Sequence, residues 1–128
     1  LGSSGLAPED NIRMYTAKNI GSGNFYVYSA SGTLTNTQSL SVSCGRGTWK
    51  WAVDAYRPAA GTFRYHRAGT ATLHDGDAET IAYDLAAAGG SGGTETFTIA
   101  AANNVITATY GTASTVSAAI TVFGTKAI

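Results

Sequence analysis

Apolar and polar residues alternate with a period of two along many short segments, and this pattern most strongly constrains the fold. In "TWKWAVDAY", residues 48–56, Trp49, Trp51 and Val53 share one face, and Lys50 and Asp54 lie opposite. A period of two is typical of a β-strand with one buried face. The pattern predicts strands in the segments 24–30, 38–44, 48–56, 62–73, 79–85, 94–101, 105–110 and 114–128.

Turn-forming residues separate these segments. "HDGD", residues 74–77, is a strong hairpin signal, and Asn103-Asn104 predicts a tight turn because asparagine tolerates left-handed backbone angles. The glycine-rich run "AAAGGSGG", residues 86–93, predicts a flexible loop or a break between two sheet segments. No segment has a sustained helical period. Residues 77–88 offer the one place for a short helix, and Thr80, Ile81 and Tyr83 favour a strand there.

Seven to eight short strands at turn spacing predict an all-β fold. We expect a single antiparallel β-sandwich or barrel with an immunoglobulin-like or jelly-roll-like outline. A chain of 128 residues suggests one domain. The small, polar and turn-rich start "LGSSGLAPED" predicts an extended N-terminal arm over residues 1–13, followed by the sandwich domain over residues 14–128.

The composition is unusually poor in large and charged side chains. More than half of the residues are Ala, Gly, Ser or Thr, and 12% are charged, about half the usual fraction. Small side chains fill little core volume, so a chain of this kind often needs neighbours to complete its burial. We therefore expect a subunit of an assembly, with a lean monomeric β-domain as the alternative.

Charge is unevenly placed along a chain whose net charge is zero. Residues 1–67 carry seven basic and three acidic side chains, and residues 68–128 carry one basic and five acidic ones. Opposite patches can orient subunits against one another. The pattern predicts contacts between subunits that join Arg46, Arg57, Arg64 or Arg67 of one copy to Asp75, Asp77, Asp84 or Glu95 of another. A neutral chain is a poor candidate for binding nucleic acid.

The aromatic hairpin of residues 45–69 has two interpretations. In the first, Trp49 and Trp51 belong to the core, since aromatic side chains most often do. Alternation then places Phe63 and Tyr65 on one face of the returning strand and Arg64 and His66 on the other, with Lys50 and Arg64 projecting to solvent. In the second, the two indoles lie on an open face and stack on a glycan, assisted by Asp54, Tyr56 and His66.

A protein–protein surface is the third role that this region could serve. Tyrosine, tryptophan and arginine are the residues that most often anchor such surfaces. Exposed ion pairs contribute only about 0–1 kcal/mol each, so apolar and aromatic contacts have to supply most of the affinity. The candidate interaction surface consists of Arg46, Lys50, Arg57, Arg64, His66, Arg67, Tyr26, Tyr28 and Phe123.

The sequence predicts no catalytic, cofactor-binding or metal-ligating residues. "HDGDAE" places Asp75, Asp77 and Glu79 at alternate positions, but the spacing of an EF-hand loop is absent. A nucleophile elbow, a His-Glu-x-x-His motif and a phosphate-binding loop are absent too. Cys44 is the single cysteine, and alternation predicts a buried thiol. No hydrophobic run reaches the length of a membrane span.

The stretch "NFYVYSASGTLTNTQSLSVSCGRGTWKWAVDAY", residues 24–56, has a regular succession of strands and turns. With the polar arm and the low charge, it resembles bacteriophage virion proteins such as capsid decoration proteins, head fibres and tail modules. The resemblance covers most of the chain. It implies a non-enzymatic structural subunit, located in the virion, that contacts further copies of itself or other capsid or tail proteins. The alternative is a secreted or cell-surface carbohydrate-binding or adhesion module that uses Trp49 and Trp51.

Overall fold

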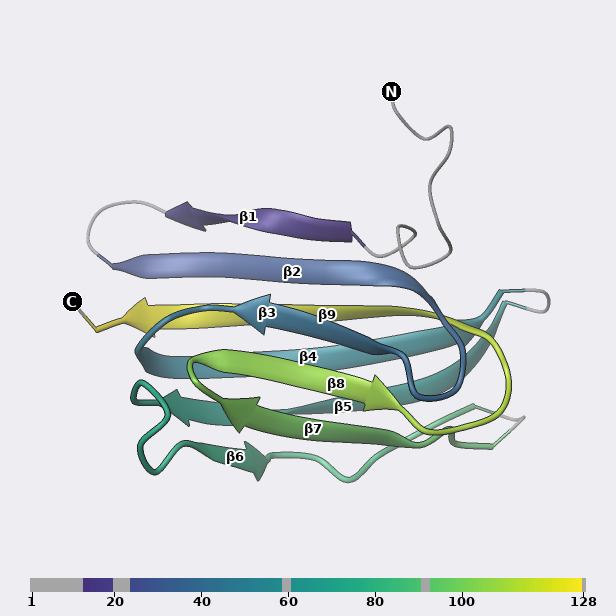
Figure 1. Ribbon diagram of the computed structural model, residues 1–128. Coiled ribbons are helices and arrows are strands. Elements are labelled where there is room, and N and C mark those ends of the chain that lie inside the picture. Colours follow the sequence, from purple (N-terminus) through teal and green to yellow (C-terminus); the bar gives the residue numbers. More distant parts are fainter. Residues whose placement is uncertain (1–12, 20–23, 59–60, 91–92, 128) are drawn as a thin grey trace.

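The computed structural model describes the backbone of residues 13–19 and the whole of residues 24–58, 61–90 and 93–127. The described residues form β-strands and no helix (Figure 1). The strands are β1 (Arg13–Asn19), β2 (Phe25–Leu34), β3 (Ser39–Ser43), β4 (Gly47–Arg57), β5 (Thr62–Leu73), β6 (Thr80–Tyr83), β7 (Phe97–Ala102), β8 (Val105–Tyr110) and β9 (Val116–Lys126).

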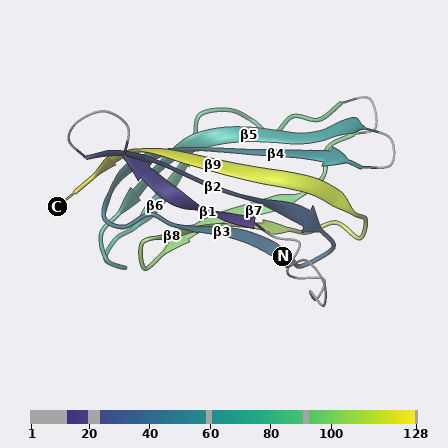
Figure 2. The same cartoon turned by 90° about the horizontal axis from the view of Figure 1, so that it is seen from above.

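These strands form two antiparallel sheets. The larger sheet has the order β1-β2-β9-β4-β5-β6, and the smaller one has the order β3-β8-β7. Seen from above, the two sheets form two layers (Figure 2). Buried side chains of both sheets form one hydrophobic core. The predicted all-β, antiparallel sandwich is therefore confirmed.

The strand β1 is the element that the sequence pattern did not predict. It pairs with β2, from Arg13 opposite Ser31 to Asn19 opposite Tyr26, and forms one edge of the larger sheet. Residue 13, which we had assigned to the arm, begins this strand. The rest of the predicted arm, residues 1–12, lies outside the described residues.

The largest side chains of the core are aromatic. Trp49 and Trp51 are 0% and 1% exposed, so the prediction that both indoles belong to the core is confirmed. Tyr65 of the larger sheet packs on Phe97 of the smaller one, with ring centroids 4.7 Å apart, and Phe97 packs on Tyr110 at 5.1 Å. These few large rings compensate for the small side chains elsewhere, because each aromatic ring buries much apolar area.

A glycine makes room for one of the tryptophans. Gly69 on β5 lies directly opposite Trp51 on β4. A Cβ atom at position 69 would lie 2.6 Å from Cζ2 of Trp51 and would also collide with the carbonyl oxygen of Ala82. The missing side chain of Gly69 therefore leaves space for the Trp51 indole.

Both predicted turns are present. Asn103 and Asn104 have φ values of 51° and 66°, and Asp75 and Gly76 have φ values of 60° and 92°. These are the left-handed angles that a tight hairpin turn requires. The chain also leaves the larger sheet after β6 and enters the smaller sheet at β7. The predicted break between sheet segments near residues 86–93 is thus confirmed.

Candidate interaction surface

The larger sheet has an outer face on which no described strand packs (Figure 2). The register of the strands sets its side chains in rows across β2, β9, β4 and β5. We call this surface the outer face. It consists of Phe25, Val27, Ser29, Ser31, Thr33, Ser117, Ala119, Thr121, Phe123, Thr125, Thr48, Lys50, Ala52, Asp54, Tyr56, Phe63, His66, Ala68, Thr70 and Thr72.

Exposed aromatic residues lie toward the two ends of the outer face. Phe25 and Phe123 are 36% and 41% exposed, and their ring centroids are 6.1 Å apart. Toward the other end, the exposed Tyr56 packs on Phe63 at 5.8 Å. Between them lie small side chains such as Ser29 and Ala119. Phe123 is therefore outward, as predicted.

The prediction that Tyr28 faces outward was wrong. Its side chain is buried, packs edge-on against Trp49 at 5.5 Å, and donates a 3.0 Å hydrogen bond to the carbonyl of Cys44. Tyr26 lies on the same inward side and is half-buried. Phe25 and Val27 are on the opposite face, and sequence reasoning did not select them. Both faces of this strand carry large apolar residues, so alternation alone did not show which face is buried.

The burial of the two tryptophans also contradicts the alternative in which Trp49 and Trp51 stack on a glycan. Trp49 and Trp51 have no ring face open to solvent, and stacking on a sugar requires one. Asp54, Tyr56 and His66, the polar groups that this alternative places beside the glycan, do lie on the outer face. There the Asp54 carboxylate already bonds to Nδ1 of His66, at 2.7 Å.

A β-bulge changes the direction of Arg64, which we had expected to project to solvent. Ala55 pairs with Tyr65, but Tyr56 pairs with Phe63, so Arg64 has no partner on β4. The shift places Phe63 on the outer face beside Tyr56. The Arg64 side chain is only 12% exposed and reaches Glu95. A bulge commonly redirects a side chain in this way.

Glu95 is the buried centre of a small ionic cluster. Its side chain is 3% exposed, and its Oε2 accepts hydrogen bonds from Nε of Arg64 at 2.8 Å and from Nη2 of Arg57 at 3.1 Å. Burial acts to raise the pKa of Glu95, but the bonds from Arg64 and Arg57 outweigh it and hold the pKa below its ordinary value. The carboxylate thus stays charged and ties the β4–β5 hairpin to the segment that leads into β7.

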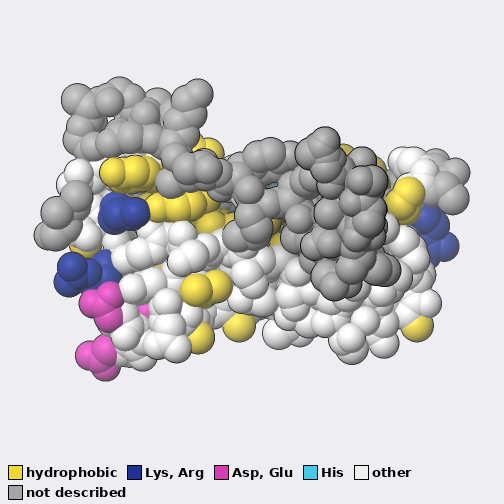
Figure 3. Space-filling model, turned by 45° about the horizontal axis from the view of Figure 1, so that its top comes forward, with side chains coloured by type: hydrophobic (Ala, Val, Ile, Leu, Met, Phe, Trp, Pro, Cys, Tyr) yellow, Lys and Arg dark blue, Asp and Glu magenta, His cyan; other side chains and the backbone are white. Residues whose placement is uncertain are grey.

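The predicted segregation of basic and acidic patches was wrong. Folding pairs the two halves of the chain within one molecule: Arg46 with Asp75 at 3.4 Å, Lys50 with Asp84 at 3.3 Å, and Arg57 and Arg64 with Glu95. Arg67 lies 3.7 Å above the ring of Tyr83 and donates to the carbonyl of Leu85. In the view of Figure 3, the charged side chains that can be seen lie toward the two ends of the molecule.

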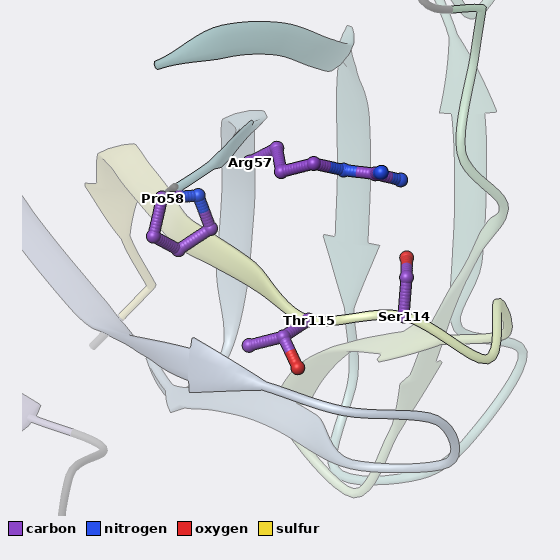
Figure 4. Close-up of a pocket in the computed structure, with 4 residues that line it drawn as sticks. All are labelled: Arg57, Pro58, Ser114 and Thr115. Atoms are coloured by element: carbon purple, nitrogen blue, oxygen red, sulfur yellow. The ribbon is translucent and has the colours of Figure 1, made fainter. Parts of the chain in front are cut away.

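A hollow of about 260 Å³ lies beside Arg57, lined by Arg57, Pro58, Ser114 and Thr115. Arg57 extends across it, and the Ser114 hydroxyl points toward Arg57 (Figure 4). That hydroxyl shares a 2.6 Å hydrogen bond with Tyr110, and Arg57 already binds Glu95. The Ser114 hydroxyl and Nη2 of Arg57 are therefore engaged in hydrogen bonds, whereas Nε of Arg57 is buried without a hydrogen-bond partner among the described residues.

The acidic loop "HDGDAE" is organised by backbone donors. The Glu79 carboxylate accepts hydrogen bonds from the backbone N–H groups of His74, Gly76 and Asn104. Asn104 also bonds to Asp75 through its side chain, at 2.7 Å. These contacts join the β5–β6 loop of one sheet to the β7–β8 turn of the other. Within the described ranges, no three His, Cys, Asp or Glu side chains come together as a metal site would need.

Cys44 is buried, as alternation predicted. Its Sγ atom lies 3.6 Å from the carbonyl oxygen of Val42. Burial raises the pKa of the Cys44 thiol to about 12, against a smaller lowering by Lys126. A thiol with so high a pKa has almost no thiolate at neutral pH, so it is a poor nucleophile.

Comparison with known proteins assigns no family to this chain. No protein-family model matches it, and no curated protein matches its sequence. A structural match is the tailspike protein of Acinetobacter phage vB_ApiP_P1, with 14% sequence identity and a TM-score of 0.44. The match covers 98% of this chain and 23% of the tailspike chain, so this chain spans less than a quarter of that protein. In the described part of this chain, no helix is long and apolar enough to cross a membrane.

Proposed function

We propose that this chain is a non-enzymatic structural subunit of a bacteriophage virion, of the capsid decoration or tail type, and that it acts through protein–protein contacts. The observation that carries this proposal is the outer face, a broad sheet surface with Phe25, Tyr56 and Phe123 exposed to solvent. Exposed aromatic residues around small, uncharged side chains are typical of surfaces that bind protein. The virion setting rests on the resemblance of the sequence to virion proteins.

The use made of the acidic groups supports a structural role. The carboxylates of Glu79 and Glu95 are bound by backbone N–H groups and by arginines, respectively, and Asp84 pairs with Lys50. Groups that hold loops and strands together in this way are not poised for acid–base chemistry. The thiol of Cys44 is buried and protonated.

Mass spectrometry of purified particles tests this function. Phage particles are purified by density gradient from the organism that encodes the chain, washed at high salt, and digested. Peptides of this chain are expected in the particle fraction at the level of the other structural proteins. The soluble fraction of the same lysate is the control. Finding the chain only in that fraction would contradict the proposal.

A further inference from the structure

The half of the outer face over β2 and β9 carries no charged side chain. Its rows run from Phe25 opposite Thr125, through Val27 opposite Phe123 and Ser29 opposite Thr121, to Thr33 opposite Ser117. Phe25 and Phe123 are both more than a third exposed. We call this half the β2–β9 face. It combines two exposed phenylalanines with a floor of Ser, Thr and Ala, which allows another flat surface to approach closely.

The other half, over β4 and β5, carries the charged side chains of the outer face, and each lies beside a partner on the same molecule. Lys50 pairs with Asp84 at 3.3 Å, and Asp54 contacts His66 at 2.7 Å. The charges of the outer face are therefore few and confined to one half. Like charges repel a second copy of a surface, and the β2–β9 face carries none.

The size of the outer face is sufficient for a specific contact between two copies. Its four long strands have 10 to 12 residues each. With strands about 4.8 Å apart and a rise of about 3.3 Å per residue, they cover roughly 650 Å². Two such faces together bury roughly 1,300 Å², within the range of about 1,200–2,000 Å² found for specific interfaces.

We propose that the whole outer face, of which the β2–β9 face is the uncharged half, binds the same outer face of a second copy of this chain, so that two larger sheets stack face to face about a two-fold axis. Such an isologous contact needs a surface that is complementary to itself, and a sheet surface with few charges and exposed aromatic residues meets that need. Thr121 lies in the central row of the larger sheet, between Ser29 and Ala52. It therefore lies near the axis and close to its own mate. This inference rests on the proposed function, because it names the partner of the same surface.

Sedimentation velocity of the full chain tests the stacking. Wild-type protein is expected to change from monomer to dimer as its concentration rises. Thr121→Arg is expected to raise the dissociation constant of the dimer at least about tenfold, because two like charges meet near the axis. The matched control is Thr98→Arg, an exposed threonine on the outer side of the smaller sheet. It should leave the dimer unchanged, and near-ultraviolet circular dichroism should show that both variants are folded.

Cross-linking gives a second readout that does not depend on an added charge. Under mild oxidation, Thr121→Cys is expected to form a covalent dimer, whereas Thr98→Cys is not. Cys44 is buried and does not compete. A wild-type chain that stays monomeric at every concentration, with no cross-link through position 121, would overturn the proposal.

The outcomes also separate this inference from the proposed function. If the chain dimerises but is absent from phage particles, the inferred dimer is supported and the proposed virion function is refuted. A chain that is present in particles yet monomeric, and whose incorporation is blocked by Thr121→Arg, uses the face for a different virion protein. That result would refute the proposal that the partner is a second copy of this chain, and it would leave the proposed virion function unaffected.

Discussion

Arg64 Nε donates a 2.8 Å hydrogen bond to Oε2 of Glu95, and the bond exists because β5 has a bulge at Arg64. Without the one-residue shift, the guanidinium would lie on the outer face, away from the carboxylate. The bond joins two segments that are 31 residues apart in sequence. It is therefore a tertiary contact that fixes the path of the chain between the sheets.

Removing the Glu95 carboxylate should destabilise the fold strongly. Glu95→Ala leaves Arg64 with its charge nearly buried and unpaired, and breaking a buried pair typically costs about 3–5 kcal/mol. The matched control is Asp84→Ala, which removes an exposed ion pair with Lys50 and should cost less than about 1 kcal/mol. Urea denaturation followed by tryptophan fluorescence measures both. Equal losses of unfolding free energy in the two variants would show that the buried cluster contributes no more stability than an exposed ion pair.

The same cluster predicts how stability depends on pH. The pKa of Glu95 is lower in the folded chain than its ordinary value of 4.5. Its contribution to stability is therefore fully present above about pH 4.5 and is lost as pH falls through the lower folded pKa. The difference in unfolding free energy between wild type and Glu95→Gln should be constant from pH 7 to pH 5 and shrink below that. A difference that stays constant down to the acid limit of folding would contradict the lowered pKa.

Alternation located the strands β2 to β9, the buried tryptophans and Cys44 because burial on one face leaves a period of two in the sequence. It failed where one face could not be distinguished from the other. Residues 25–28 are all large and apolar, so the pattern did not show that Tyr28 is inward. The bulge at Arg64 reverses the faces beyond it, and the sequence carries no clear sign of that extra residue. A one-residue shift is enough to exchange every side chain between core and solvent.

The charge pattern misled for a different reason. Basic and acidic residues are separated along the chain, but antiparallel pairing and the loops bring distant segments together. Arg46 meets Asp75 and Lys50 meets Asp84 within one molecule. Linear separation therefore gave no measure of separation in space, and the predicted patches cancel. The sequence pattern did not predict the outer face as one surface. Its rows of side chains depend on the order of the strands in the sheet, and no local sequence pattern contains that order.

Adding a methyl group at position 69 should be costly. In Gly69→Ala, the new Cβ would collide with the Ala82 carbonyl and lie 2.6 Å from the Trp51 ring, so a strand or the indole has to move. Overpacking of this kind costs about 1–3 kcal/mol, and the tryptophan emission should change. Gly93→Ala is the control, because no atom of the described residues lies within 4 Å of its Cβ position, and its expected cost comes from the backbone angle. An unchanged emission spectrum with full stability in Gly69→Ala would show that the indole tolerates the methyl group.

The Glu79 carboxylate should govern the end of the sandwich where the two sheets are joined. It accepts three backbone N–H groups, two from the β5–β6 loop and one from Asn104 in the β7–β8 turn. Glu79→Ala leaves these donors without their acceptor, so hydrogen exchange should rise at residues 74–79 and 103–104 together. The loss of global stability should be about 1–3 kcal/mol, as expected when hydrogen-bond partners are removed. Asp77→Ala, an exposed carboxylate in the same loop, should leave exchange at residues 103–104 unchanged. If exchange in Glu79→Ala rises only in residues 74–79, the two loops are not coupled through this side chain.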